Sequence, residues 1–86
     1  MSDAFSVDEE VRVAQQFLKG YSLPEGVRVV ARPGKADGVM VVQLTCHGPE
    51  GTRSTRRDSL GTWSAADEAS KTAMIVGLCE TLAQPV

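Results

Sequence analysis

One run of residues, Val39–His47, constrains the fold of this chain more than any other segment. Side chains along a β-strand point to opposite faces in turn. In this run, every second residue is apolar, and the residues between them are mixed. The apolar set is Met40, Val42, Leu44 and Cys46, and the mixed set is Val39, Val41, Gln43, Thr45 and His47. The run therefore predicts a strand that covers a hydrophobic core.

Turn-rich segments stand on both sides of this run. Residues 33–38 and residues 48–51 each contain one proline and two glycines. Short turns of this kind join antiparallel neighbours. The flanking strands are therefore predicted at residues 27–32, which alternate, and at residues 52–60, which are rich in Thr, Ser and Arg. Together with the central run, they form a three-stranded antiparallel meander.

A helix is predicted before the strands, over residues 7–19. Ser6 followed three residues later by Glu9 fits a capping box, in which the serine caps the helix and acidic residues fill its first turn. Apolar residues then recur at helical spacing as far as Leu18, and Gly20 is a typical stop.

A second helix is predicted after the strands, from a capping-box pattern at Ser64 to about residue 83. Trp63, just before it, is expected to close one end of the core. The chain is therefore predicted to be one α+β domain over residues 1–86, in the order α-β-β-β-α. Two helices are expected to pack on one face of a three-stranded antiparallel sheet.

The apolar residues of the second helix fall into two sets. The small set is expected against the sheet, because alanine lets a helix approach closely. The bulky set either packs on the first helix, which a thin core favours, or forms the interface of a homodimer. The small set is Ala65, Ala69, Ala73 and Val76, and the bulky set is Ile75, Leu78, Cys79 and Leu82.

The net charge of −2 conceals an uneven distribution. Residues 28–57 contain six basic and two acidic residues, whereas the segments before and after them are acidic. The arginines of the predicted strands form a candidate anion site for phosphate, nucleic acid or an acidic protein. An alternative is a solvated edge strand whose charges prevent aggregation. The candidates are Arg28, Arg32, Arg53, Arg56 and Arg57, of which alternation puts Arg56 and Arg57 on opposite faces.

Residue types that carry catalysis or bind metals do not form a recognisable set in the sequence. Cys46 and His47 are adjacent in a predicted strand, so they point to opposite faces and are poorly placed to chelate one ion. Cys79 has no CxxC partner, and both cysteines are expected to be reduced thiols. With no nucleophile motif or phosphate-binding glycine pattern, the chain is expected to bind a partner without catalysis, cofactor or metal.

The sequence also predicts a location. Its N-terminus lacks a basic region followed by an apolar stretch, so no signal peptide is expected. No apolar run approaches the ~20 residues that a membrane span requires. The protein is therefore expected to be soluble and cytoplasmic.

The predicted α-β-β-β-α order resembles that of double-stranded-RNA-binding domains, and the Ala-rich residues 65–73 resemble the second helix of that family. The resemblance implies a nucleic-acid-binding module. Where the family places lysines, however, this chain has Asp67 and Glu68, and carboxylates repel a phosphate backbone. If the chain binds nucleic acid, the basic strands are therefore expected to make the contacts.

The chain also resembles small accessory proteins of bacteriophages and other mobile elements, including phage sandwich domains and anti-CRISPR proteins. The resemblance lies in its length, its acidic balance and the closing pattern of residues 63–79. It implies an inhibitor or modulator of a bacterial host complex, acting in the host cytoplasm. Asp67 and Glu68 are then candidate phosphate substitutes on its surface. This is the leading functional hypothesis from the sequence, ahead of nucleic-acid binding and of a purely structural subunit.

Overall fold

The first helix, α1 (Val7–Lys19), has the predicted bounds in the computed structural model, which describes residues 6–83. Ser6 caps it, since its Oγ accepts a hydrogen bond from the backbone N–H of Glu9 at 3.3 Å. The N-terminal residues that bear on the signal-peptide prediction lie outside the described range, as does Pro85.

Three strands follow in a meander: β1 (Arg28–Ala36), β2 (Val39–His47) and β3 (Arg53–Ser59). They form one antiparallel sheet in the order β1-β2-β3, as predicted. A short 3-10 helix, η1 (Pro49–Gly51), lies in the connection between β2 and β3. The central strand has the predicted bounds, and the third differs from its prediction by one residue at each end.

The predicted end of the first strand at residue 32 is wrong, because β1 continues through Pro33 and Gly34. Proline is tolerated there because β1 is an edge strand, where one N–H group need not pair. The chain reverses instead at Asp37 and Gly38, whose φ angles are 52° and 79°. Two successive positive φ angles are typical of a tight hairpin turn, and an Asp-Gly pair adopts them readily.

The predicted start of the second helix at Ser64 is also wrong. A one-turn helix, α2 (Thr62–Ala65), holds Trp63, and the long helix α3 (Glu68–Ala83) begins after it. Asp67 is the cap of α3, because its Oδ1 accepts a hydrogen bond from the N–H of Ser70 at 2.8 Å. Serine and aspartate both cap helices, and here the aspartate three residues after Ser64 does so. Gly61, at a φ of 94°, bends the chain after β3 so that Trp63 enters the core.

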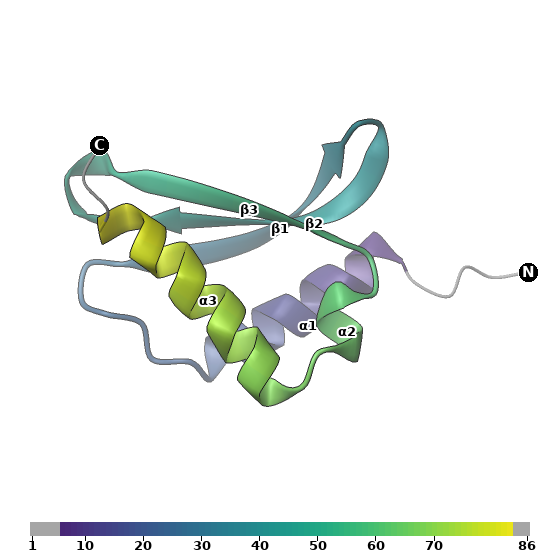
Figure 1. Cartoon of the computed structure of the whole chain (residues 1–86), viewed down its shortest axis with the longest axis horizontal. Helices are drawn as coiled ribbons and strands as arrows, with labels where there is room; N and C mark the ends of the chain where they lie inside the picture. Colours follow the sequence, from purple (N-terminus) through teal and green to yellow (C-terminus); the bar gives the residue numbers. More distant parts are fainter. Residues whose placement is uncertain (1–5, 84–86) are drawn as a thin grey trace, which may run out of the picture.

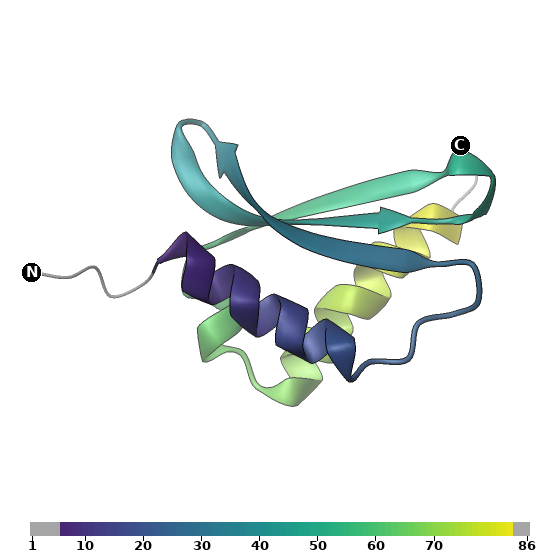
Figure 2. The same ribbon diagram turned by 180° about the vertical axis from the view of Figure 1, so that it is seen from behind.

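All three helices lie on one side of the sheet, and no described element covers the other side (Figure 1). The view from behind shows the same two layers (Figure 2). The core between the layers contains Val11, Ala14, Val29, Ala31, Val42, Leu44, Cys46, Trp63, Ile75 and Leu78. The predicted α+β fold, with its helices on one face of a three-stranded antiparallel sheet, is therefore confirmed.

The two apolar sets of α3 are arranged opposite to the prediction. Ala69 and Ala73 are exposed, whereas Ile75 and Leu78 are buried. The helix packs on β2 and β3, and Ser54 of β3 donates a hydrogen bond to the backbone oxygen of Leu78 at 3.0 Å. Bulky side chains fill the space between a helix and a sheet better than alanine does. Since they are buried within one chain, they are not available for the dimer interface predicted on this helix.

A polar network joins α1, α2 and β3 inside the core. Glu10, fully buried, accepts hydrogen bonds through Oε1 from the N–H groups of Trp63 and Ser64, at 3.2 and 3.3 Å. The residue before α2, Gly61, has no side chain to cap it. Glu10 therefore supplies the acceptor that a helix N-terminus requires. The indole N–H of Trp63 donates to Asp58 of β3 at 3.2 Å.

Over the described residues 6–83, no helix combines the length and the apolar character that crossing a membrane demands.

Candidate functional site

The side of the sheet away from the helices carries four of the five candidate arginines. Strand pairing aligns Arg28, His47 and Arg53 in one row across the sheet. A second row, four residues further along the outer strands, consists of Arg32, Gln43 and Arg57. Between them lies a row of Val30, Thr45 and Thr55. We call the surface formed by these three rows the open face.

The four arginines of the open face are exposed, and they stand near the corners of a rectangle. Four residues along a strand span ~13 Å, and two strand spacings span ~10 Å. Within the three described strands, no acidic residue lies on the open face. The carboxylates closest in sequence to the open face are Asp58, which faces the helical layer, and Glu25, Asp37 and Glu50, which lie outside the three strands. The open face is therefore a positively charged surface on a protein whose net charge is negative.

Arg56 lies on the other side of the sheet, under the helical layer, as strand alternation predicted for one of the adjacent pair. Its Nε donates to both carboxylate oxygens of Asp58, each at 2.9 Å. Asp58 is only 8% exposed and also accepts the indole N–H of Trp63. The guanidinium of Arg56 therefore balances a buried carboxylate, and Arg56 is removed from the candidate binding site.

Arg57 differs from the other arginines of the open face because a neighbour holds it. Its Nε donates a hydrogen bond to Oε1 of Gln43 on the central strand, at 3.1 Å. Gln43 in turn lies against Gly34 of β1. A Cβ atom added at position 34 would stand 3.0 Å from both Cβ and Oε1 of Gln43. The glycine therefore leaves the space that the glutamine side chain occupies.

Gln43, His47 and Gly34 were not among the residues selected from the sequence. Alternation had placed Gln43 and His47 on the mixed face of the central strand. Their alignment with the arginines depends on the register of the three strands, which the sequence did not define. Gly34 was assigned to a turn, so its place beside the central strand was missed.

Asp67 and Glu68 lie away from the open face, at the start of α3 in the helical layer. The carboxylate of Asp67 caps the helix, and the N–H of Ser70 that binds it lowers the pKa of this group. Glu68 lines a groove of about 530 Å³ between α1 and α3. Apart from Arg56, the predicted candidates therefore fall on two separate surfaces, the arginines on the open face and the two carboxylates at the start of α3.

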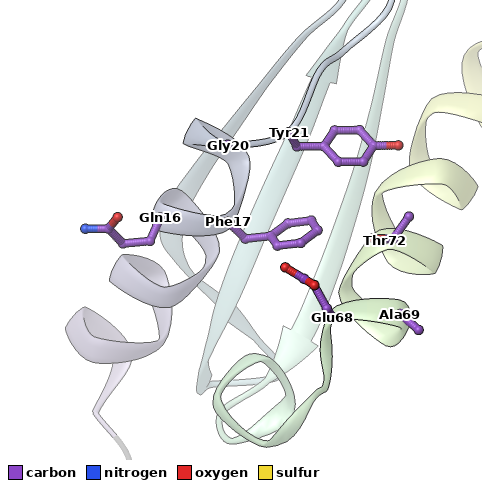
Figure 3. Close-up of a pocket in the computed structure, with 7 residues that line it drawn as sticks. All are labelled: Gln16, Phe17, Gly20, Tyr21, Glu68, Ala69 and Thr72. Carbon is purple, nitrogen blue, oxygen red and sulfur yellow. The ribbon is translucent and has the colours of Figure 1, made fainter.

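Aromatic side chains form the wall of the groove between the helices. In Figure 3, the rings of Phe17 and Tyr21 project from the end of α1 toward α3, and Glu68 faces them. The two rings stack with their centroids 5.7 Å apart, and Nζ of Lys71 lies 5.9 Å from the centroid of Phe17. Glu68 also lines a neighbouring hollow together with Arg12 and Lys71, so this part of the helical layer has no single charge preference.

The two cysteines lie close together but are free thiols. Their Sγ atoms are 3.9 Å apart, with Cys46 fully buried under the sheet and Cys79 half-buried on α3. Burial, together with the neighbouring Cys79, raises the pKa of Cys46 to about 12. Among the described residues, no group of three or more His, Cys, Asp and Glu side chains is placed to hold a metal ion.

This difference in burial predicts unequal reactivity toward iodoacetamide. Only a thiolate reacts rapidly, so Cys46 should stay unlabelled at pH 8 while Cys79 is alkylated. Mass spectrometry of tryptic peptides after native labelling measures both sites. Labelling in denaturant, which should modify both cysteines, is the control. Equal rates in the native protein would contradict the buried position of Cys46.

Comparison of the chain with protein-family models, with curated proteins and with solved structures finds no match. The two resemblances drawn from the sequence therefore stay predictions.

Proposed function

We propose that this chain is a binding module whose open face contacts the phosphate backbone of a nucleic acid. The observation that carries the proposal is the set of four exposed arginines, Arg28, Arg32, Arg53 and Arg57, on a sheet face without a carboxylate in the described strands. Phosphate contacts from arginine dominate the affinity of such modules and do not depend on base sequence.

The negative net charge does not oppose this function. The acidic side chains of α1 and α3 belong to the layer on the far side of the sheet (Figure 1). At physiological ionic strength, the Debye length is ~8 Å, so salt screens these carboxylates from a ligand on the open face. The local surface, rather than the sum of charges, then governs the approach of a polyanion.

The same geometry gives less support to the inhibitor that the resemblance to phage accessory proteins implies. A phosphate-mimicking surface needs a concentration of free carboxylates. In the helical layer, however, Asp67 is engaged as a helix cap, and Glu68 shares a surface hollow with Arg12 and Lys71. Inhibition of a bacterial host complex stays a prediction. Capture of a stoichiometric bacterial partner that nuclease treatment does not release would support it over nucleic-acid binding.

Fluorescence anisotropy with labelled duplex DNA, duplex RNA and single strands tests the proposal. Four phosphate contacts predict a slope of about −3.6 for log affinity against log salt, or a roughly 150-fold loss between ~50 and ~200 mM salt. The double variant Arg28→Ala/Arg53→Ala should bind more weakly, with a slope smaller by about two.

Arg12→Ala is the matched control. Like the single variant Arg53→Ala, it removes one positive charge, but from an exposed position on α1, on the other side of the molecule. Its affinity and salt slope should equal those of the unaltered protein. No binding of any nucleic acid at ~50 mM salt would contradict the proposal, and so would an equal loss in the Arg12→Ala control.

A further inference from the structure

We propose that the open face enters the major groove of a DNA duplex and that Arg57, positioned by Gln43, recognises guanine there. This inference rests on the proposed function, since it assigns the class of nucleic acid and the residue that reads it. The other three arginines then bind phosphates, so the salt slope on duplex DNA falls from about −3.6 to about −2.7, and Arg57 alone provides sequence preference.

The dimensions of the sheet favour this groove. The outer strands of a three-stranded sheet are ~10 Å apart, and the major groove of B-DNA is ~12 Å wide. A sheet lying along the groove would direct the arginines of β1 and β3 toward the two phosphate backbones that border it. The central strand, with Gln43 and Thr45 on its open side, would face the base edges.

The side chains of the open face argue against RNA and single strands. The major groove of A-form RNA is too deep and narrow for side chains to read. Proteins that hold single strands stack bases on aromatic rings. On the described strands, the three rows of the open face contain no aromatic residue other than the imidazole of His47.

The hydrogen bond to Gln43 gives Arg57 a role that the other arginines lack. It directs the guanidinium inward over the central strand, instead of outward from the edge strand. It uses Nε alone, so the N–H groups on both Nη atoms stay free. A guanidinium presented in this way can donate two hydrogen bonds to O6 and N7 of guanine, the most common specific contact in the major groove.

Gly34 completes the arrangement. Gln43 Oε1, which accepts the bond from Arg57, lies only 3.0 Å from the position that a Cβ at residue 34 would occupy. A larger residue at position 34 would require the side chain of Gln43 to shift by a few tenths of an ångström, which would disturb its bond with Arg57. Gln43 is therefore a positioning residue, which acts on DNA through Arg57.

Selection from a random-sequence DNA duplex library, followed by sequencing, tests the inference. The unaltered protein should enrich guanine at one or more positions, and replacing that guanine should weaken binding roughly 5- to 100-fold. With Arg57→Ala, which removes the fork of donors, enrichment of guanine should vanish. Arg32→Ala, from the same row, should weaken all sequences alike and keep the guanine preference.

Gln43 is tested by the same measurement. Gln43→Ala should lose the preference for guanine, whereas Gln43→Glu, which still accepts a bond from Arg57, should keep the preference at lower overall affinity. Thermal unfolding followed by circular dichroism checks that each variant is folded.

The outcomes separate this inference from the function on which it rests. Binding of duplex DNA without an enriched guanine, binding of RNA alone, or an enriched guanine that Arg57→Ala retains would each overturn the inference and leave nucleic-acid binding in place. Failure to bind any nucleic acid would overturn both.

Discussion

Replacing Leu78 with glutamate should unfold this protein. Leu78 is 4% exposed, between α3 and the sheet. The substitution removes about 2–5 kcal/mol of packing and leaves a carboxylate without a partner in an apolar site. Small domains have stabilities of ~0.05–0.15 kcal/mol per residue, or roughly 4–13 kcal/mol at this length. The combined loss is comparable with the whole stability, and circular dichroism should show an unfolded chain.

Val76→Glu is the matched control on the same helix. Val76 is 38% exposed, so its glutamate side chain can remain in water and the domain should stay folded. Sedimentation of both variants also tests the predicted homodimer. If Leu78→Glu were a folded monomer derived from a dimeric parent, Leu78 would lie between subunits and its buried position would be contradicted. If Leu78→Glu unfolds as expected, any dimer of the unaltered protein has to use another surface, such as a sheet edge.

The sequence predicted most helices and strands correctly, because helix caps and strand alternation are set by residues close together in the chain. The cap at Ser6 and the alternation of Val39–His47 each depend on a few neighbouring residues, and both elements have the predicted bounds. The predicted end of the first strand was wrong because Pro33 and Gly34 are residue types that are common in turns. Whether proline ends a strand depends on its place in the sheet, which is a tertiary property.

Local sequence signals could not predict which side of α3 faces the sheet. Its apolar residues surround the helix, so periodicity alone allowed either Ala73 or Ile75 to face the sheet. The choice depends on the volume to be filled between the layers, and the bulkier side chain occupies it. A wide apolar circumference therefore leaves the sequence pattern with little information about which side of α3 faces the core.

The candidate site was predictable in its charges and not in its geometry. Alternation separated Arg56 from Arg57, and the structure agrees with that separation. The partnership of Arg57 with Gln43 requires the register of two strands joined by the η1 connection, and register depends on turn geometry as much as on pattern. The ion pair between Arg56 and Asp58, which takes Arg56 out of the binding site, could not be predicted because it depends on the burial of Asp58 in the folded protein.

Trp63→Ala should be the most destabilising substitution to alanine in the protein. The indole is fully buried, packs near Phe17 with ring centroids 6.3 Å apart, and donates to Asp58. Removing a buried tryptophan side chain costs about 3–5 kcal/mol through lost burial and the remaining cavity. For a domain of this size, each kcal/mol of lost stability lowers Tm by ~4–8 °C, so Tm should fall by roughly 12–40 °C. At the upper end of this range, the variant would already be unfolded before heating begins.

Trp63→Phe separates the two contributions of the indole. Phenylalanine keeps most of the buried ring and loses the N–H donor, while Asp58 retains its two contacts with Arg56. The net value of one such hydrogen bond is about 0.5–1.5 kcal/mol, to which the smaller ring adds a modest cavity cost. Denaturation followed by circular dichroism should therefore place this variant between the unaltered protein and Trp63→Ala, and closer to the former. If phenylalanine proved as destabilising as alanine, the bond to Asp58, rather than the packing of the ring, would be what holds α2 against the sheet.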